Sequence, residues 1–193
     1  MGRKARYDKK QFIRGALKLL AELGPAGVTM NAVAEEIGAP IGSVYHRFVS
    51  RDVLLAELWL QVVESFQKNF LKALERSDGL EAALHTPRWV RAHPKEGKVL
   101  LLYRRDELSR GEWPDDIKAH AVKLAEELNT GIRSFVTQMF GRMSRRNLNR
   151  TVFVLIDVPH AAVRRYLEVG AILPDVVDEL IRDTYHAVYK EVV

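Results

Sequence analysis

Residues 29–54 read T-M-N-A-V-A-E-E-I-G-A-P-I-G-S-V-Y-H-R-F-V-S-R-D-V-L and predict two short helices around a glycine turn, followed by a third helix. Thr29 can accept a backbone N–H at the start of the first helix, whose apolar residues recur at helical spacing. Gly38 follows them, and glycine can end a helix because it adopts positive φ without strain. Pro40 then suits the start of the next helix, since its fixed φ is already helical. The pattern is typical of a helix-turn-helix, whose second helix presents a polar and aromatic face to DNA.

The net charge of +5 is concentrated around this motif. Residues 1–51 hold nine lysines and arginines against four acidic residues, which accounts for the whole excess, and the rest of the chain balances 21 basic against 21 acidic residues. A basic patch confined to one end is the electrostatic footprint of a phosphate-binding module. For Arg3 and Lys4 alone, a disordered, soluble basic tail is an equally good interpretation.

The composition excludes several classes of protein. Hydrophobic residues make up 47% of the 193 residues and charged residues 28%, as in ordinary soluble globular proteins. The absence of cysteine excludes disulfides, thiolate metal sites and cysteine nucleophiles, and it fits a reducing cytoplasm. No apolar run reaches the ~18 residues that span a bilayer, and the charged N-terminus has no apolar segment behind it. We therefore expect a soluble, cytoplasmic protein.

The remaining sequence predicts an all-α chain of about nine helices. Residues 151–156 are rich in β-branched side chains that suit a strand, but no partner strand is apparent, so a helix is predicted here too. Asp157 and Pro159 indicate an internal restart of that helix, with the aspartate as its cap. The expected helices cover about 8–23, 30–37, 41–48, 51–74, 80–89, 98–108, 114–139, 151–169 and 176–192.

Two neighbouring segments resemble a known family. G-A-P-I-G-S-V-Y-H-R-F at 38–48 and S-R-D-V-L-L-A-E-L at 50–58 are similar to the signature of TetR-type bacterial transcriptional regulators. The resemblance implies a three-helix DNA-binding domain at 1–51 and a helical regulatory domain at 52–193. It further implies a repressor that a small apolar or aromatic effector releases from a palindromic duplex operator.

The resemblance also implies a homodimer formed by the last two helices, at about 151–169 and 176–192. Both helices are apolar over faces wider than one neighbour would cover, which favours an interface over ordinary core packing. A twofold dimer matches the two half-sites of a palindrome, which lie about 34–36 Å apart.

The resemblance places the second helix of the motif in the major groove. Gly42 would let the backbone approach DNA, and the ring and hydroxyl of Tyr45 suit a thymine methyl group or a phosphate oxygen. Core packing of Tyr45 and a plain surface role for His46 remain alternatives. The residues expected to contact DNA are Arg3, Lys4, Arg6, Thr29, Ile41, Gly42, Ser43, Tyr45, His46 and Arg51.

Two positions depart from the family's pattern. Pro40 stands where a serine or threonine usually caps the recognition helix, so a side-chain cap is lost there. Ile41 stands where a polar residue often precedes the glycine, which replaces a hydrogen-bonding contact with an apolar one. Nearby, Arg47 is expected to pair with Glu35 or Glu36 rather than with a base. The operator sequence therefore does not follow from the resemblance.

An effector site would need a mostly apolar pocket with a few polar anchors. Several aromatic and polar residues of 52–193 suit these roles, although aromatic residues at helical spacing more often belong to the core. The ligand-binding candidates are Trp59, Phe66, Trp89, Tyr103, Arg104, His120 and Phe135.

Enzymatic signatures are absent from the sequence. It contains no H-E-x-x-H, G-x-S-x-G, G-x-x-x-x-G-K-[ST] or G-x-G-x-x-G motif, and no two of its six histidines stand four residues apart. No catalytic residue, metal site or cofactor is therefore predicted. Two alternatives to an effector-controlled repressor remain: a constitutive DNA-binding regulator without effector, and a helical small-molecule-binding protein that has lost DNA binding.

Overall fold

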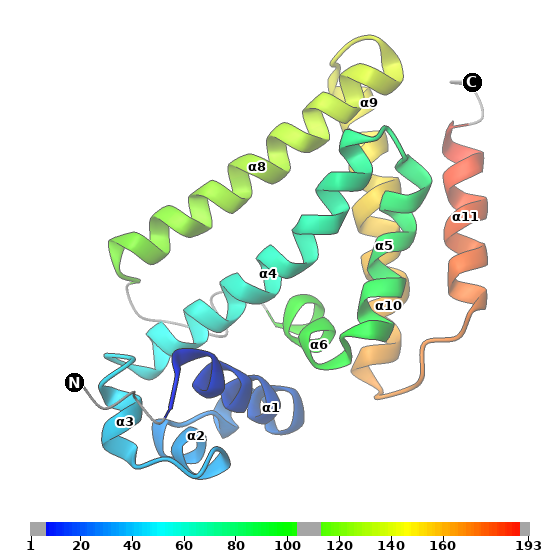
Figure 1. Cartoon of the computed structure of the whole chain (residues 1–193). Coiled ribbons are helices and arrows are strands. Elements are labelled where there is room, and N and C mark those ends of the chain that lie inside the picture. Colours follow the sequence, from blue (N-terminus) through cyan, green and yellow to red (C-terminus); the bar gives the residue numbers. More distant parts are fainter. Residues whose placement is uncertain (1–6, 104–112, 190–193) are drawn as a thin grey trace.

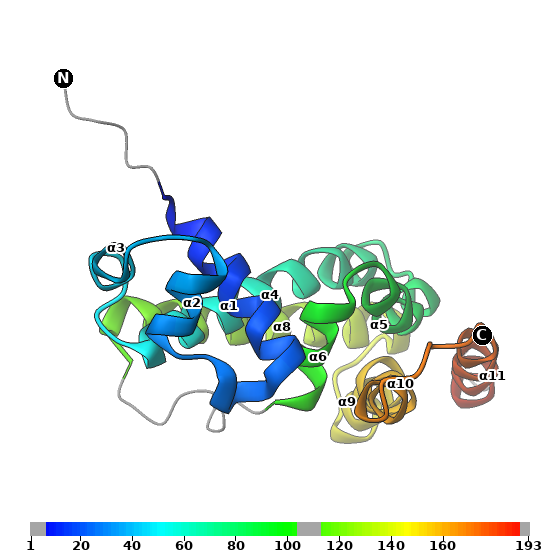
Figure 2. The same ribbon diagram turned by 90° about the horizontal axis from the view of Figure 1, so that it is seen from below.

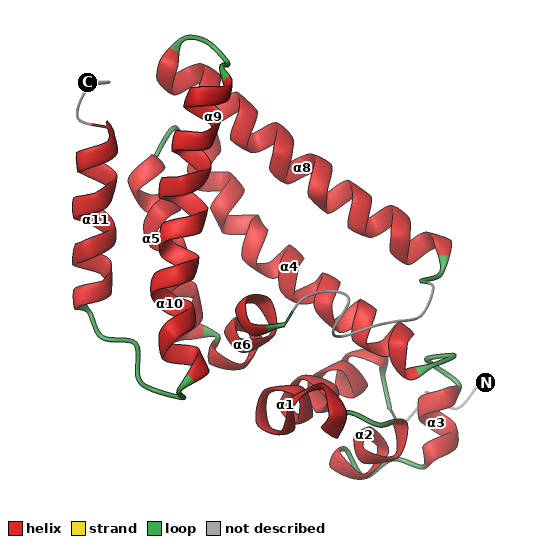
Figure 3. Cartoon of the chain, turned by 180° about the vertical axis from the view of Figure 1, so that it is seen from behind, coloured by secondary structure: helices red, strands yellow, loops and turns green. Residues whose placement is uncertain are grey.

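The computed structural model describes residues 7–103 and 113–189. Within these two ranges every regular element is a helix and no strand is present (Figure 1, Figure 3), so the prediction of an all-α fold is confirmed. A small head of three helices lies at one end, and the other helices extend from it to α11 at the opposite end (Figure 2). None of the helices in the described ranges is long and apolar enough to cross a membrane.

The starts of the head's helices follow from local sequence. Asp8 accepts the Gln11 N–H at 2.8 Å while the Gln11 side chain accepts the Asp8 N–H, which forms a reciprocal capping box. Thr29 caps the second helix as predicted, accepting the Ala32 N–H at 3.0 Å. The three helices are α1 (Lys9–Gly27), which kinks at Gly24, α2 (Met30–Glu36) and α3 (Ile41–Tyr45).

The head closes around a small aromatic core. Phe12 of α1 and Phe48, which follows α3, are fully buried and meet edge to face with ring centroids 6.2 Å apart. Val44 is fully buried as well, and it anchors α3 to this core. The helix is shorter than the predicted 41–48, because the N–H groups of Arg47 and Phe48 both bond to the Val44 carbonyl at 2.9 Å and the chain then leaves the helix.

A single long helix, α4 (Arg51–Glu75), leads out of the head. Ser50 caps it by accepting the Val53 N–H at 3.2 Å, as the sequence predicts. Its 25 residues span about 37 Å at 1.5 Å per residue. It packs against α1 at one end and along α8 (Asp115–Phe140), so buried residues are continuous across position 51. The division into domains at 1–51 and 52–193 therefore remains a prediction.

Two shorter helices follow α4, namely α5 (Gly79–Ala92) and α6 (Pro94–Leu102). The sixth helix begins at its proline rather than at Lys98 as predicted, because proline suits the first turn of a helix. It ends before Tyr103, whose backbone is extended. Residues 104–108 of the predicted helix lie outside the described residues.

The predicted helix at 151–169 begins earlier than expected. Ser144 accepts the Asn147 N–H at 3.1 Å, and this cap starts the helix six residues before Thr151. Gly170, at a φ of 67°, ends it as predicted. The chain runs without interruption through α9 (Arg145–Val152), a π-helical turn η1 (Phe153–Asp157) and α10 (Val158–Glu168).

The predicted restart at Asp157 is wrong. Asp157 has helical backbone angles and no capping hydrogen bond, and the Val158 N–H bonds instead to the Phe153 carbonyl five residues back. This wider π turn accommodates Pro159, which has no N–H and would crowd a regular α-turn. Counted as one helix, 145–168 brings the described ranges to nine helices, the number predicted.

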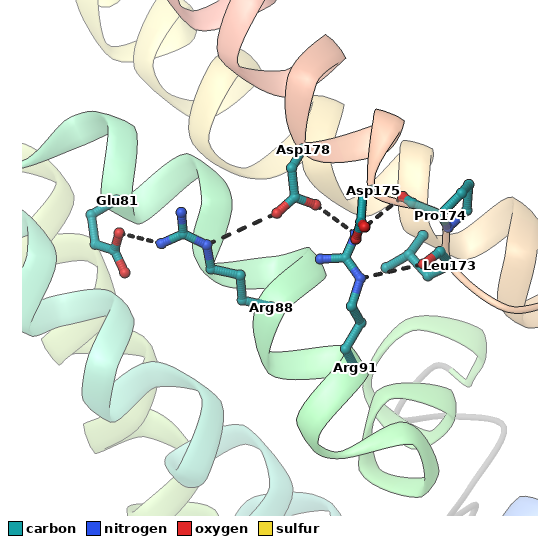
Figure 4. Close-up of polar contacts among 7 residues, drawn as sticks. All are labelled: Glu81, Arg88, Arg91, Leu173, Pro174, Asp175 and Asp178. Atoms are coloured by element: carbon teal, nitrogen blue, oxygen red, sulfur yellow. Dashed lines mark hydrogen bonds and ion pairs between the residues drawn. The ribbon is translucent and has the colours of Figure 1, made fainter.

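The last helix, α11 (Val176–Tyr189), is held to α5 by arginine contacts (Figure 4). Arg91 donates to the carbonyls of Leu173 and Pro174 at 3.3 and 3.1 Å and to the Asp178 carboxylate at 2.7 Å. Arg88, one turn earlier, lies 3.9 Å from the same carboxylate. Because a guanidinium is a planar group with five donors, one arginine joins both the loop before α11 and its first turn to α5. Residues 190–192 of the predicted helix lie outside the described residues.

Candidate nucleic-acid interface

One face of α3 is open to solvent, at the edge of the head away from α11 (Figure 1, Figure 2). Val44 turns toward the core, whereas Ile41 and Tyr45 are 39% and 56% exposed. Gly42 and His46 are exposed beside them. This exposure rules out the alternative that Tyr45 is a core residue. The four residues form a continuous outer face, because positions 41 and 45, and likewise 42 and 46, are one helical turn apart.

Gly42 is not required by the packing of the head. A Cβ placed there would have no heavy atom within 4 Å, apart from its immediate surroundings in the helix. By contrast, a Cβ on Gly15 would lie 2.7 Å from the Ile37 side chain, where α1 and α2 press together. The space in front of Gly42 is therefore open, and the bare backbone there lets an external partner approach closely.

Main-chain bonds hold the turn before α3. The Ala39 N–H bonds to the Ala34 carbonyl at 2.9 Å, and the Tyr7 hydroxyl donates to the Gly38 carbonyl at 2.7 Å. Pro40 makes no side-chain capping bond, so the loss of a cap at this position is confirmed. Sequence reasoning missed Tyr7, because a partner 31 residues away leaves no local signal.

Arg51 points into the head rather than outward. Its Nε and Nη2 atoms donate to the carbonyls of Val28 and Pro25, each at 2.5 Å, and its Nη1 atom lies 3.4 Å from the Asp52 carboxylate. The side chain thus joins the start of α4 to the connection between α1 and α2. The guanidinium of Arg51 is therefore engaged by main-chain carbonyls, which the sequence pattern did not reveal. For this reason we no longer count Arg51 among the predicted DNA contacts.

The other predicted DNA contacts differ in position. Thr29 is exposed while it caps α2, and Ser43 is partly buried. Arg47 donates to the Tyr7 carbonyl at 3.5 Å. The Glu36 carboxylate accepts a hydrogen bond from the Lys18 ammonium at 2.8 Å, so it pairs with Lys18 and not with Arg47 as expected. The remaining three predicted contacts lie outside the described residues: Arg3, Lys4 and Arg6.

A family model described as bacterial regulatory proteins of the tetR family matches residues 12–58, which include most of α1, all of α2 and α3, and the start of α4. Residues 12–58 are thus a TetR-family head. The match includes the open face of α3, whereas five of the nine basic residues of 1–51 precede the match, at positions 3, 4, 6, 9 and 10. The resemblance read from residues 38–58 is therefore confirmed.

Solved structures share the fold over nearly the whole length of this chain. The fatty acid degradation regulator FadR from Bacillus halodurans superposes with a TM-score of 0.71 at 12% identity, covering 96% of each chain. FadR from Bacillus subtilis, solved in complex with stearoyl-CoA, superposes with a TM-score of 0.70 at 12% identity. The superposition covers 94% of this chain and 97% of the FadR chain. A TetR-family transcriptional regulator from Streptomyces coelicolor superposes with a TM-score of 0.59 at 17% identity. The superposition covers 96% of this chain and 99% of the other. A comparison with curated proteins found no match.

Two of the predicted ligand-binding residues come together behind the TetR-family head. Phe66 of α4 and Trp89 of α5 meet edge to face with centroids 5.3 Å apart. The rings of His85 and His160 lie 4.8 and 6.0 Å from the Phe66 ring, and the His85 Nε2 atom is 2.9 Å from the Phe66 carbonyl. We call these four residues the aromatic–histidine cluster. Sequence reasoning missed both histidines, because their meeting depends on how α5 packs against α4 and α10 packs against α5.

The other predicted ligand-binding residues do not join this cluster. Trp59 packs near another tryptophan, with centroids 6.2 Å apart, and His120 lies 3.7 Å from a glutamate of α4. Tyr103 lies beside the kink of α1, and Phe135 lies against the first residue of α5. Arg104 lies outside the described residues. The seven predicted residues therefore do not line one site.

The histidines of the cluster make stability depend on pH. Burial lowers the pKa of His160 from its ordinary 6.5 to about 4, opposed in part by the charge of Asp157, and burial also lowers the pKa of His85. Folding thus favours the neutral rings. The stability they contribute is complete above pH 6.5 and is lost as the pH falls from 6.5 toward 4.

We expect acidification from pH 7 to pH 5 to remove about 2 kcal/mol of unfolding free energy through His160 alone. Urea denaturation at a series of pH values measures this change. The H160Q variant should show a shallower loss, and H46Q, which replaces an exposed histidine, should keep the wild-type slope. Equal slopes for wild type and H160Q would contradict the assignment.

Proposed function

We propose that the chain is a homodimeric transcriptional repressor that binds a palindromic operator through α3 and is released from it by a small apolar effector. The observation that carries this proposal is the open face of α3 in a TetR-family head. That face has Ile41, Gly42, Tyr45 and His46 on its surface, and the whole basic excess of the chain lies in residues 1–51, which include α3. Charge of this sign attracts phosphates, while the helix face supplies contacts to bases.

Exposed apolar residues support the dimer. Ile172, in the loop between α10 and α11, is 92% exposed, and Leu180 of α11 is 60% exposed. Val177 and Ile181 are buried on the other side of α11, whereas Val176, 47% exposed, lies one turn before Leu180, so these two form a second apolar face of the same helix, next to Ile172 in the sequence. A second copy of the chain related by a twofold axis would cover this face and present two α3 helices to the two half-sites of a palindrome.

DNA selection tests the proposal directly. Duplexes with a random central segment are incubated with the purified protein, and bound sequences are recovered, sequenced and assayed by fluorescence anisotropy. We expect an inverted repeat whose half-site centres lie about one helical turn apart. Affinity should fall steeply as salt rises from 50 to 200 mM, because binding releases counterions from phosphates. No enrichment together with salt-independent or absent binding would reject DNA reading.

The aromatic–histidine cluster is the proposed place of effector binding. Next to it in sequence, the Gln67 Oε1 and Thr86 Oγ1 atoms are buried without a hydrogen-bond partner. Buried polar atoms are usually paired, so these two favour a ligand that offers a hydrogen-bond donor beside an apolar body. Effector binding would shift the dimer toward a conformation in which the two α3 helices no longer match the half-site spacing.

Operator release measures effector action. Stearoyl-CoA is one probe to begin with, since the FadR structure from Bacillus subtilis was solved with it, and smaller aromatic amines and alcohols form a second set. A true effector should raise the operator Kd of the wild type but not of a W89A variant that still binds the operator. If no probe in either set changes operator affinity, a constitutive regulator is the better description.

A further inference from the structure

Ile41 occupies the outer face of α3 without a role in the fold. Its side chain is 39% exposed, while the core below is already filled by Val44 and Phe48, which are fully buried. Tyr45, one turn later on the same face, is 56% exposed. Between them Gly42 leaves open space. The proposed base-reading end of α3 is thus an apolar strip with no charged side chain on it.

An isoleucine can distinguish base edges in only one way. In the major groove, bases present hydrogen-bond donors and acceptors, with a single apolar group, the C5 methyl of thymine. Ile41 has nothing to offer a donor or acceptor, and covering such a group with its side chain would leave a polar atom unpaired. Contact with a methyl group buries apolar surface on both sides.

Resting on the proposed function, we propose that Ile41, flanked by Tyr45, reads the C5 methyl group of one thymine in each operator half-site. Burial of a methyl group corresponds to about a fourfold change in affinity, so loss of both methyl groups in a twofold operator corresponds to about fifteenfold. Specificity at this base pair is then set by the methyl group, and the remaining face of α3 supplies polar contacts from Ser43 and His46.

Deoxyuridine provides the test, because it differs from thymidine only by the missing methyl group. Each thymine of the selected operator is replaced in turn, symmetrically in both half-sites, and the Kd is measured by fluorescence anisotropy. At one symmetric position the wild type should bind the uracil operator about fifteenfold more weakly. The I41A variant should bind the thymine and uracil operators equally at that position.

A matched control is V49A, which truncates an apolar side chain that is 79% exposed and lies outside α3. It should keep the fifteenfold discrimination, and all variants should melt like the wild type. Specific binding that is unaffected by uracil at every position would overturn the methyl reading while leaving the proposed function in place. If wild type and I41A discriminate equally between the thymine and uracil operators, another residue contacts the methyl group, and the role of Ile41 is overturned. Failure of the wild type to bind any duplex would overturn both.

Discussion

Replacing Phe48 by alanine is expected to lower the free energy of unfolding by about 3–5 kcal/mol. The side chain is fully buried, and its ring meets Phe12 edge to face at 6.2 Å. The Lys9 ammonium lies 5.6 Å from the centre of the same ring. Truncation would remove these contacts and leave a cavity between α1 and the end of α3, which a head of three short helices cannot close by collapse.

Urea denaturation followed by circular dichroism measures this loss, and V49A is the control. Val49 is the next residue in the chain but is 79% exposed, so its truncation should change stability by no more than about 0.5 kcal/mol. Because Val44 and Phe48 anchor α3, F48A should also lose operator binding. A loss of less than 1 kcal/mol in F48A would show that the core of the head is not closed around this ring.

Replacing Leu180 by aspartate is expected to convert the proposed dimer into monomers. Leu180 is 60% exposed on α11, so the change is tolerable in the isolated chain. In the dimer the carboxylate would be desolvated without a partner, a penalty of several kcal/mol that corresponds to at least about a hundredfold weaker association. Operator affinity should fall by a similar factor, because a monomer reads one half-site.

Light scattering coupled to size exclusion gives the mass of each species, and anisotropy gives the operator Kd. V122D is the matched control, since Val122 is 55% exposed but lies on α8. It should remain dimeric and bind the operator normally. A dimeric L180D would exclude this face of α11 from the interface, and a monomeric V122D would move the interface to α8.

Local chemistry accounts for the parts of the fold that the sequence predicted well. Thr29 and Ser50 cap helices with their own side chains, and Gly170 ends one by its positive φ. Each depends on neighbours within a few residues, so a linear pattern contains the information. The same holds for the missing cap at Pro40.

Predictions that depended on distant partners fared less well. Arg51 was expected to face phosphates from a helix start, but the fold brings the carbonyls of Pro25 and Val28 to it. The aromatic candidates were scattered for the same reason: helical spacing shows which face is apolar, but not which helix covers it. Among the candidates that the structure describes, only Phe66 and Trp89 meet, and the two histidines that join them were missed.

The π turn between α9 and α10 makes the length of this segment a constraint in its own right. A π turn holds one residue more than an α turn, so η1 is equivalent to a single-residue insertion in a regular helix. Deleting one residue from 153–157 would turn the π turn into an α turn and leave α9 and α10 in nearly their present relative rotation, because five residues of a π turn cover about the same angle as four of an α turn. Thr151, fully buried and 3.1 Å from the Tyr189 hydroxyl, would keep facing α11, but the ring of Pro159 would then press on the carbonyl four residues before it. We therefore expect a one-residue deletion in this stretch to be tolerated only when Pro159 is replaced as well.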